Sequence, residues 1–204
     1  MPAHDPTPTP QRRSYAKGIA RRQEILDRAI EVFAQRGARR TSLRAIAQEV
    51  GVTHAALTHY FGSLEELLVE VYRESEHRSD GPPPSPEATP AEMMQISAAE
   101  NREIPGLVQL YSTLVAAALE DGHPAAQDFV SRRFAGLRHE LTARVRDLQA
   151  TGRVRDDLDP ALVAALTIAA SDGLQTQWLL DSSVDHEAAL GLLDRLLAGP
   201  KTRT

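Results

Sequence analysis

The chain has 204 residues, of which 42% are hydrophobic and 25% charged, and it contains no cysteine. This composition is close to that of an average globular protein, and a chain of this length buries roughly 70% of its unfolded surface without a disulfide or a metal. The lack of cysteine excludes a disulfide scaffold, a thiolate zinc site and an iron–sulfur cluster.

The net charge of −5 is unevenly distributed. Residues 1–60 hold ten Lys or Arg against five Asp or Glu, whereas residues 61–204 hold thirteen against twenty-three. This separation of a basic N-terminal part from an acidic remainder favours polyanion binding by the N-terminal part. The N-terminus lacks the apolar core of a signal peptide, and no apolar run is long enough to cross a bilayer. We therefore expect a cytoplasmic protein without a membrane partner.

The first sixty residues predict three helices behind a proline-rich, disordered tail at residues 1–13. An apolar stripe predicts a helix from about Lys17 to Gln35, ended by Gly37. A short helix follows Thr41 and Ser42, and a third one follows Thr53, a residue type favoured as an N-cap. We treat residues 14–61 as one domain.

The remaining residues, 62–200, also read as helical, so the fold class predicted is all-α with about nine helices. Ser63, followed three residues later by Glu66, predicts a capping box at the start of the fourth helix. A proline-rich loop is expected at 79–91, because proline lacks an N–H and restricts the residue before it. Periodic apolar positions then predict helices at about 91–101, 105–119, 124–150, 160–180 and 185–197.

Two short helices joined at Gly51 fit a helix-turn-helix. Glycine suits the turn, because a positive φ is required there. In the second helix Leu57 is predicted to anchor the inner face, which leaves the small or polar residues outside: His54, Ala55, Thr58 and His59. Such a helix can enter the major groove of DNA, although helical hairpins that bind nothing are also common.

The segments ILDRAIEVFAQRGARRTSLRAIAQEVGV and LTHYFGSLEELL resemble the TetR family of transcriptional regulators, closely over residues 20–70. The stretch from Gly152 to Leu197 is also similar to the closing helices of many members. The resemblance implies a three-helix DNA-binding head on a larger helical domain for effector binding and dimerisation. It further implies a homodimer on double-stranded, palindromic operator DNA, and repression that a small-molecule effector relieves.

The DNA-binding residues that the resemblance implies are Lys17, Ser42, Arg44, Thr53, His54, Ala55, Thr58, His59 and Tyr60. Arg44 is the candidate for guanine, whereas Thr53 and Tyr60 are expected to hold phosphates. The family often has tyrosine at the position of Thr58 and lysine at that of Leu64. That tyrosine and that lysine commonly contact the DNA backbone, and this chain lacks both. Operator affinity is therefore expected to depend more on the N-terminal arginines here.

The helix at 160–180 is rich in alanine, and together with the leucines of the last helix it suits a four-helix bundle across a two-fold axis. The leucines considered are Leu190, Leu193, Leu196 and Leu197. Burial of both helices within one subunit is the alternative.

A ligand pocket is predicted among apolar and aromatic residues of the central helices, although such residues more often form plain core. The candidates are Tyr72, Met94, Leu107, Tyr111, Leu114, Phe129, Arg133, Phe134, Leu137, Leu174, Gln177 and Trp178. Arg133 could pair with an anionic effector, but we favour a solvated side chain beside Arg132. Asp172 could bind a ligand cation, pair with a neighbouring helix or face water.

An enzyme and a helical adaptor that does not bind DNA are the competing classes. The seven histidines are scattered, and His54 and His59 are five residues apart, which is not the spacing of two zinc ligands on one helix face. No nucleotide-binding loop or nucleophile elbow occurs. We therefore expect no enzymatic activity, no metal and no cofactor. The adaptor is disfavoured because it would not need a separate basic N-terminal part.

Overall fold

The computed structural model describes residues 10–36, 43–78 and 83–199, with side chains described from residue 17 to 34 and from residue 47 onward. Within these ranges the chain is all-α, as predicted, and forms nine helices without a strand. The helices are α1 (Pro10–Arg36), α2 (Leu43–Val50), α3 (His54–Phe61), α4 (Leu64–His77), α5 (Pro90–Glu103), α6 (Pro105–Ala117), α7 (Pro124–Ala150), α8 (Pro160–Leu180) and α9 (His186–Leu197).

Two helices begin earlier than predicted, one of them by a single residue. Helix α1 begins at Pro10, not near Lys17, so part of the tail expected to be disordered is helical, while residues 1–9 lie outside the described residues. Proline is well suited to the first turn of a helix, where its missing N–H would be unpaired in any case. Helix α5 begins at Pro90, inside the predicted loop, because Thr89 and Glu92 form a reciprocal capping box.

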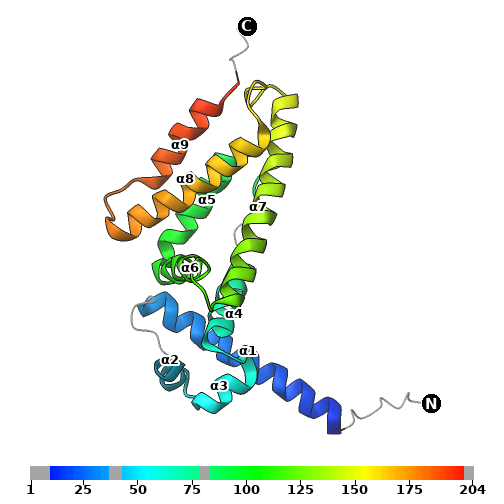
Figure 1. Ribbon diagram of the computed structural model, residues 1–204, viewed down its shortest axis with the longest axis vertical. Coiled ribbons are helices and arrows are strands. Elements are labelled where there is room, and N and C mark those ends of the chain that lie inside the picture. The colour runs from blue at the N-terminus through cyan, green and yellow to red at the C-terminus, as the bar shows by residue number, and fades with distance from the viewer. Residues whose placement is uncertain (1–9, 37–42, 79–82, 200–204) are drawn as a thin grey trace, which may run out of the picture.

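The molecule is elongated, with α1, α2 and α3 at one end and α5, α8 and α9 at the other (Figure 1). Helix α4 connects the two ends and packs on α1, α6 and α7. One continuous apolar core runs from Leu57 of α3 through Phe33 of α1 and Leu67 of α4 to Leu110 of α6. Helix α4 therefore shares one core with the three helices of the lower end and with α6 and α7.

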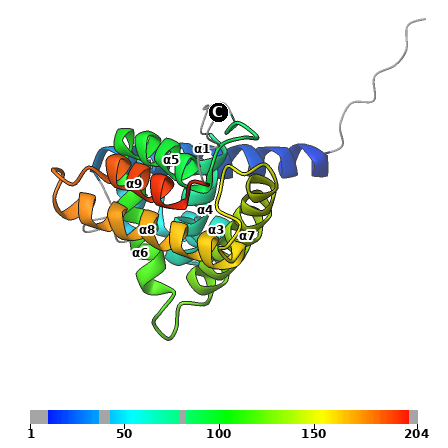
Figure 2. The same ribbon diagram turned by 90° about the horizontal axis from the view of Figure 1, so that it is seen from above.

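The upper body is built from α5, α7, α8 and α9. Helix α8 packs on α7 and α9, and α5 packs on α9. Seen from above, α5, α8 and α9 lie side by side (Figure 2). A separate apolar cluster, which includes Val145, Val163 and Leu197, closes the far end of the body. No helix in the described part of the chain is long and apolar enough to cross a membrane.

Candidate functional site

A tight turn sets the angle between α2 and α3. Gly51 has φ of 72°, which is strained for a residue with a side chain, and the N–H of Val52 donates to the carbonyl of Ala47 at 2.8 Å. Thr53 then caps α3, because its hydroxyl accepts a hydrogen bond from the N–H of Ala56 at 3.1 Å. The chain can therefore start a new helix within two residues of the turn.

Helix α3 has one buried face and one exposed face. Leu57 is fully buried and Phe61 nearly so, and both belong to the core shared with α1 and α4. On the other face His54, Ala55 and Thr58 are exposed. The outward face is therefore formed by small and polar groups on a firmly anchored helix.

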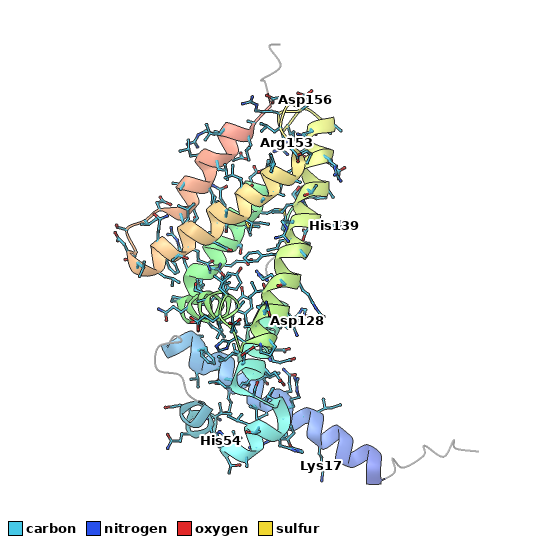
Figure 3. The ribbon with its side chains drawn as sticks, in the orientation of Figure 1. Lys17, His54, Asp128, His139, Arg153 and Asp156 are labelled. Atoms are coloured by element: carbon cyan, nitrogen blue, oxygen red, sulfur yellow. The ribbon has the colours of Figure 1, made fainter. Side chains whose placement is uncertain are left out.

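The other predicted DNA contacts have mixed surroundings. Thr53, His59 and Lys17 are exposed, and Tyr60 is half-buried with its ring edge-on to His59 at 5.2 Å between centroids. Ser42 lies outside the described residues, and Arg44 belongs to α2 but its side chain is not described. Lys17 and His54 lie at the same end of the molecule, opposite Arg153 and Asp156 (Figure 3).

Polar contacts fix both ends of α4. In its first turn, Glu65 accepts a hydrogen bond from the N–H of Ala126 at 2.6 Å and lies 2.9 Å from the Nδ1 of His123, so it caps the N-terminus of α7. Ser63 caps α4 itself by accepting from the N–H of Glu66 at 3.0 Å.

At its other end α4 is joined to α1. Arg78, the residue that ends α4, pairs with Asp27 of α1 and, at 3.1 Å, with Glu74. Glu74 also accepts a hydrogen bond from Gln23 of α1 at 2.8 Å. The hydrogen bond from Arg78 holds the pKa of Asp27 below its ordinary value.

A cavity of about 680 Å³ lies in the body, between α4, α5, α6, α7 and α8. Six of the predicted pocket residues line it: Tyr72, Met94, Leu107, Tyr111, Arg133 and Leu137. Its size is within the range of small-molecule sites.

The other six candidates are absent from the lining. Leu114 and Phe129 are buried in the core beneath α4 and α1, and Phe134 packs between this core and α8. Gln177 is exposed, and Trp178 packs edge-on against His186 at 5.5 Å between ring centroids. Leu174 does not reach the cavity either.

Several lining residues were not predicted. Two of them lie one helical turn from a candidate, since Glu76 follows Tyr72 by four positions and Ile168 precedes Asp172 by four, whereas Val108 is adjacent to Leu107. The i, i+4 relation could have identified Glu76 once Tyr72 had been placed.

A charged and aromatic cluster forms one wall of the cavity. The rings of Tyr72 and Tyr111 stack with their centroids 5.2 Å apart, and the Arg133 guanidinium lies 5.4 Å and 5.1 Å from the two centroids. Arg133 also forms an ion pair with Glu76 of α4. On the facing helix Asp172 accepts a hydrogen bond from the Tyr111 hydroxyl at 3.3 Å.

The preference for a solvated Arg133 is wrong. Its side chain is 24% exposed, against 75% for Arg132, which pairs with Asp128 on the surface of α7. Burial of Arg133 is possible because Glu76 balances its charge and two tyrosine rings cover its flat face.

Burial shifts the proton equilibria of this wall. Desolvation raises the pKa of Asp172, although the Tyr111 hydrogen bond and the Arg133 charge act in the opposite direction. Burial, with the added effect of the Asp172 charge, raises the pKa of Tyr111 to about 12. Tyr111 therefore stays protonated at neutral pH and can donate to Asp172. The described residues contain no group of three or more His, Cys, Asp or Glu placed to hold a metal.

Two family models match the chain. Residues 25–71 match the model of bacterial regulatory proteins of the tetR family. Residues 93–199, more than half of the chain, match the C-terminal model of BetI-type transcriptional repressors. The chain belongs to the TetR family of transcriptional regulators. The first match contains α3 and most of α4, and the second contains the α8–α9 pair and the cavity-lining residues of α5 to α8.

Individual relatives of this TetR-family chain agree with the assignment. The repressor KstR2 of Rhodococcus jostii is 40% identical over 67 residues, but the match covers only 33% of this chain and 32% of KstR2. The probable acrEF/envCD operon repressor of Escherichia coli K12 is 24% identical over 196 residues, which cover 91% of this chain and 89% of that protein.

Solved structures show the same fold. A crystal structure described as a putative TetR-family regulator from Rhodococcus sp. aligns with a TM-score of 0.68 and 24% identity. The alignment covers 87% of this TetR-family chain and 98% of that one.

Proposed function

We propose that this chain is a transcriptional repressor that binds operator DNA as a homodimer and leaves it when a small molecule occupies the cavity between α4 and α8. The observation that carries this proposal is the anchored helix α3, which turns Leu57 inward and Ala55 outward at one end of the molecule. Family membership and the full-length similarity to a probable operon repressor support it. As a member of a family of bacterial regulators, a repressor bound to operator DNA would work in the cytoplasm.

The proposed DNA contacts divide into two classes. His54, Ala55, Thr58 and His59, exposed on α3, would meet base edges in the major groove. The phosphate contacts are assigned to Lys17, Ser42, Thr53 and Tyr60, because backbone contacts position a protein without reading sequence. Arg44 keeps its proposed role at a guanine, where a guanidinium fork meets O6 and N7.

The proposed dimer surface is an apolar stripe on α8 and α9. Leu162 and Leu166 are exposed one turn apart on α8, and so are Leu192 and Leu196 on α9. Leu190 and Leu197, which sequence analysis assigned to this surface, are instead buried within the subunit. Exposed leucines spaced one turn apart on two helices that pack together are typical of a subunit contact.

Helix α4 would couple the cavity to the DNA-binding end. It supplies Tyr72 and Glu76 to the cavity, its Arg78 is tied to α1, and its first turn caps α7 through Glu65. In one arrangement of the dimer the spacing of the two DNA-binding heads would not match the operator. A ligand that binds this arrangement more tightly than the DNA-bound one lowers the affinity for DNA by the ratio of its two affinities.

The test is selection of bound duplexes from a random DNA pool by the purified protein. We expect enrichment of a palindromic sequence, because two identical heads related by a two-fold axis read identical half-sites. Failure to enrich any sequence at low salt, where phosphate contacts are strongest, would refute the proposed function.

A further inference from the structure

More acidic than basic residues line the cavity. Four are carboxylates and two are guanidiniums: Glu76, Glu100, Glu103, Asp172, Arg78 and Arg133. Both guanidiniums are already paired, Arg133 with Glu76 and Arg78 with Asp27 and Glu74. The lining therefore holds more carboxylates than guanidiniums.

Asp172 is a half-buried carboxylate of this set whose nearest cation, Arg133, acts on it only through its charge and is itself paired with Glu76. Among the residues that the structure describes, none forms an ion pair with it, and its recorded hydrogen bond comes from the Tyr111 hydroxyl at 3.3 Å. That distance is long for an O–H···O bond, which is usually ~2.7–2.8 Å. A partly desolvated carboxylate with one weak donor gains much from a positively charged neighbour.

The surroundings of Asp172 are mostly apolar. Ile168 lies one turn before it on α8, and Leu107 and Met94 line the same cavity from α6 and α5. Within the described ranges, the Tyr111 hydroxyl is the one polar group recorded in a hydrogen bond with the carboxylate, since the Tyr111 ring is already in contact with Tyr72 and Arg133. Such a site combines a single anionic group with a hydrocarbon-lined volume of about 680 Å³.

We propose that the effector is an organic amine, a monocation with an apolar body, whose ammonium group pairs with Asp172 and whose hydrocarbon part fills the apolar remainder of the cavity. This assignment rests on the proposed function, because it names the ligand of the effector cavity. It makes Asp172 the residue that determines charge specificity.

An anionic effector held by Arg133 is the competing assignment. Its Nε is buried without a hydrogen-bond partner, which favours an acceptor on a ligand. However, Glu76 already neutralises Arg133, and Tyr72 and Tyr111 lie against its guanidinium. An anion would have to displace Glu76 and would leave Asp172 unpaired in the same cavity. The cation is favoured because it needs no displacement.

The experiment compares three probes of equal chain length, octylammonium, 1-octanol and octanoate, by titration calorimetry on the full chain without DNA. We expect octylammonium to bind at least tenfold more tightly than 1-octanol, and octanoate to bind most weakly. Asp172→Asn keeps the size of the side chain and an acceptor for Tyr111, and should lose at least tenfold in octylammonium affinity while its affinity for 1-octanol stays within twofold.

Glu103→Gln is the matched control, because Glu103 also lines the cavity but is exposed. It should change octylammonium affinity by less than threefold. Tighter binding of octanoate than of octylammonium, or equal octylammonium affinity in wild type and Asp172→Asn, would overturn the assignment. Circular dichroism and the melting temperature of each variant show whether it is folded.

Operator binding is measured separately, so that the two failures can be told apart. A protein that selects an operator but does not bind octylammonium has the proposed function and a different effector class. A protein that binds octylammonium through Asp172 but selects no DNA retains the cation site and refutes the repressor function. Binding of both, with release of the operator by octylammonium, supports both.

Discussion

Ala55 and Leu57 lie two positions apart on α3 and have opposite surroundings. Leu57 is fully buried in the core, whereas Ala55 is exposed. Leu57 fixes the orientation of the helix. Ala55, with its small side chain, allows the outer surface of the helix to approach the base edges of the major groove closely. This division allows recognition to be altered without loss of folding.

We expect Ala55→Glu to reduce operator affinity by at least a hundredfold, because its carboxylate would be desolvated against a polyanion. The melting temperature should change little, since Ala55 is exposed on a helix. Fluorescence anisotropy with the selected duplex measures the affinity. Ala143→Glu, at an exposed position of α7, is the matched control and should bind like wild type. Equal affinity of the two variants would remove α3 from the DNA interface.

Asp172 should affect stability in the opposite sense to a paired carboxylate. Its pKa is raised by burial, so the folded state binds the proton more tightly than the unfolded state does. Its contribution to the free energy of unfolding therefore falls as pH rises from the ordinary carboxyl value of ~3.9 through the raised folded value. We expect Asp172→Asn to lose this decline and to be at least as stable as wild type at neutral pH. Urea denaturation across this pH range checks the sign, and a variant clearly less stable at neutral pH would contradict it.

At the scale of elements, helix boundaries were largely predictable. Prolines open α6, α7 and α8 where the sequence placed them, because a first-turn proline loses no hydrogen bond. The cavity was only half predictable. Periodicity identifies the apolar face of a helix, but it does not say whether that face meets another helix, as at Phe129, or a void, as at Leu107.

Arg133 shows the same limit for charged residues. Its sequence context, beside Arg132, is that of a solvated helix face. Its burial depends on Glu76, which is 57 residues away, and on the tyrosine pair. Local sequence does not encode such a partner.

Glu65 gives a test of how α4 is joined to α7. It receives a hydrogen bond from the N–H of Ala126 at the positive end of α7. We expect Glu65→Ala to lower the free energy of unfolding by about 1–2 kcal/mol, because a hydrogen bond to a charged group is lost. Urea denaturation measures this. Glu120→Ala, at an exposed position, is the control, and an equal effect of the two changes would show that the cap is not stabilising.

At the scale of the whole molecule, assembly should depend on the α8–α9 stripe. Leu166 is 54% exposed on this stripe, whereas Leu119, 86% exposed, lies beyond the end of α6. We expect Leu166→Glu to yield a monomer and to weaken operator binding, since one head alone contacts half the site. Leu119→Glu should stay dimeric. Sedimentation velocity distinguishes the two, and a dimeric Leu166→Glu protein would place the interface elsewhere.

Hydroxyl-radical footprinting of the selected operator tests the central claim most directly, because it reports how many stretches of the duplex the protein covers and how they are related. We predict two protected patches related by a two-fold axis, with centres about 34–36 Å or a larger multiple of one helical turn apart. A single patch, or no protection at saturating protein concentrations in the absence of octylammonium, would contradict the account.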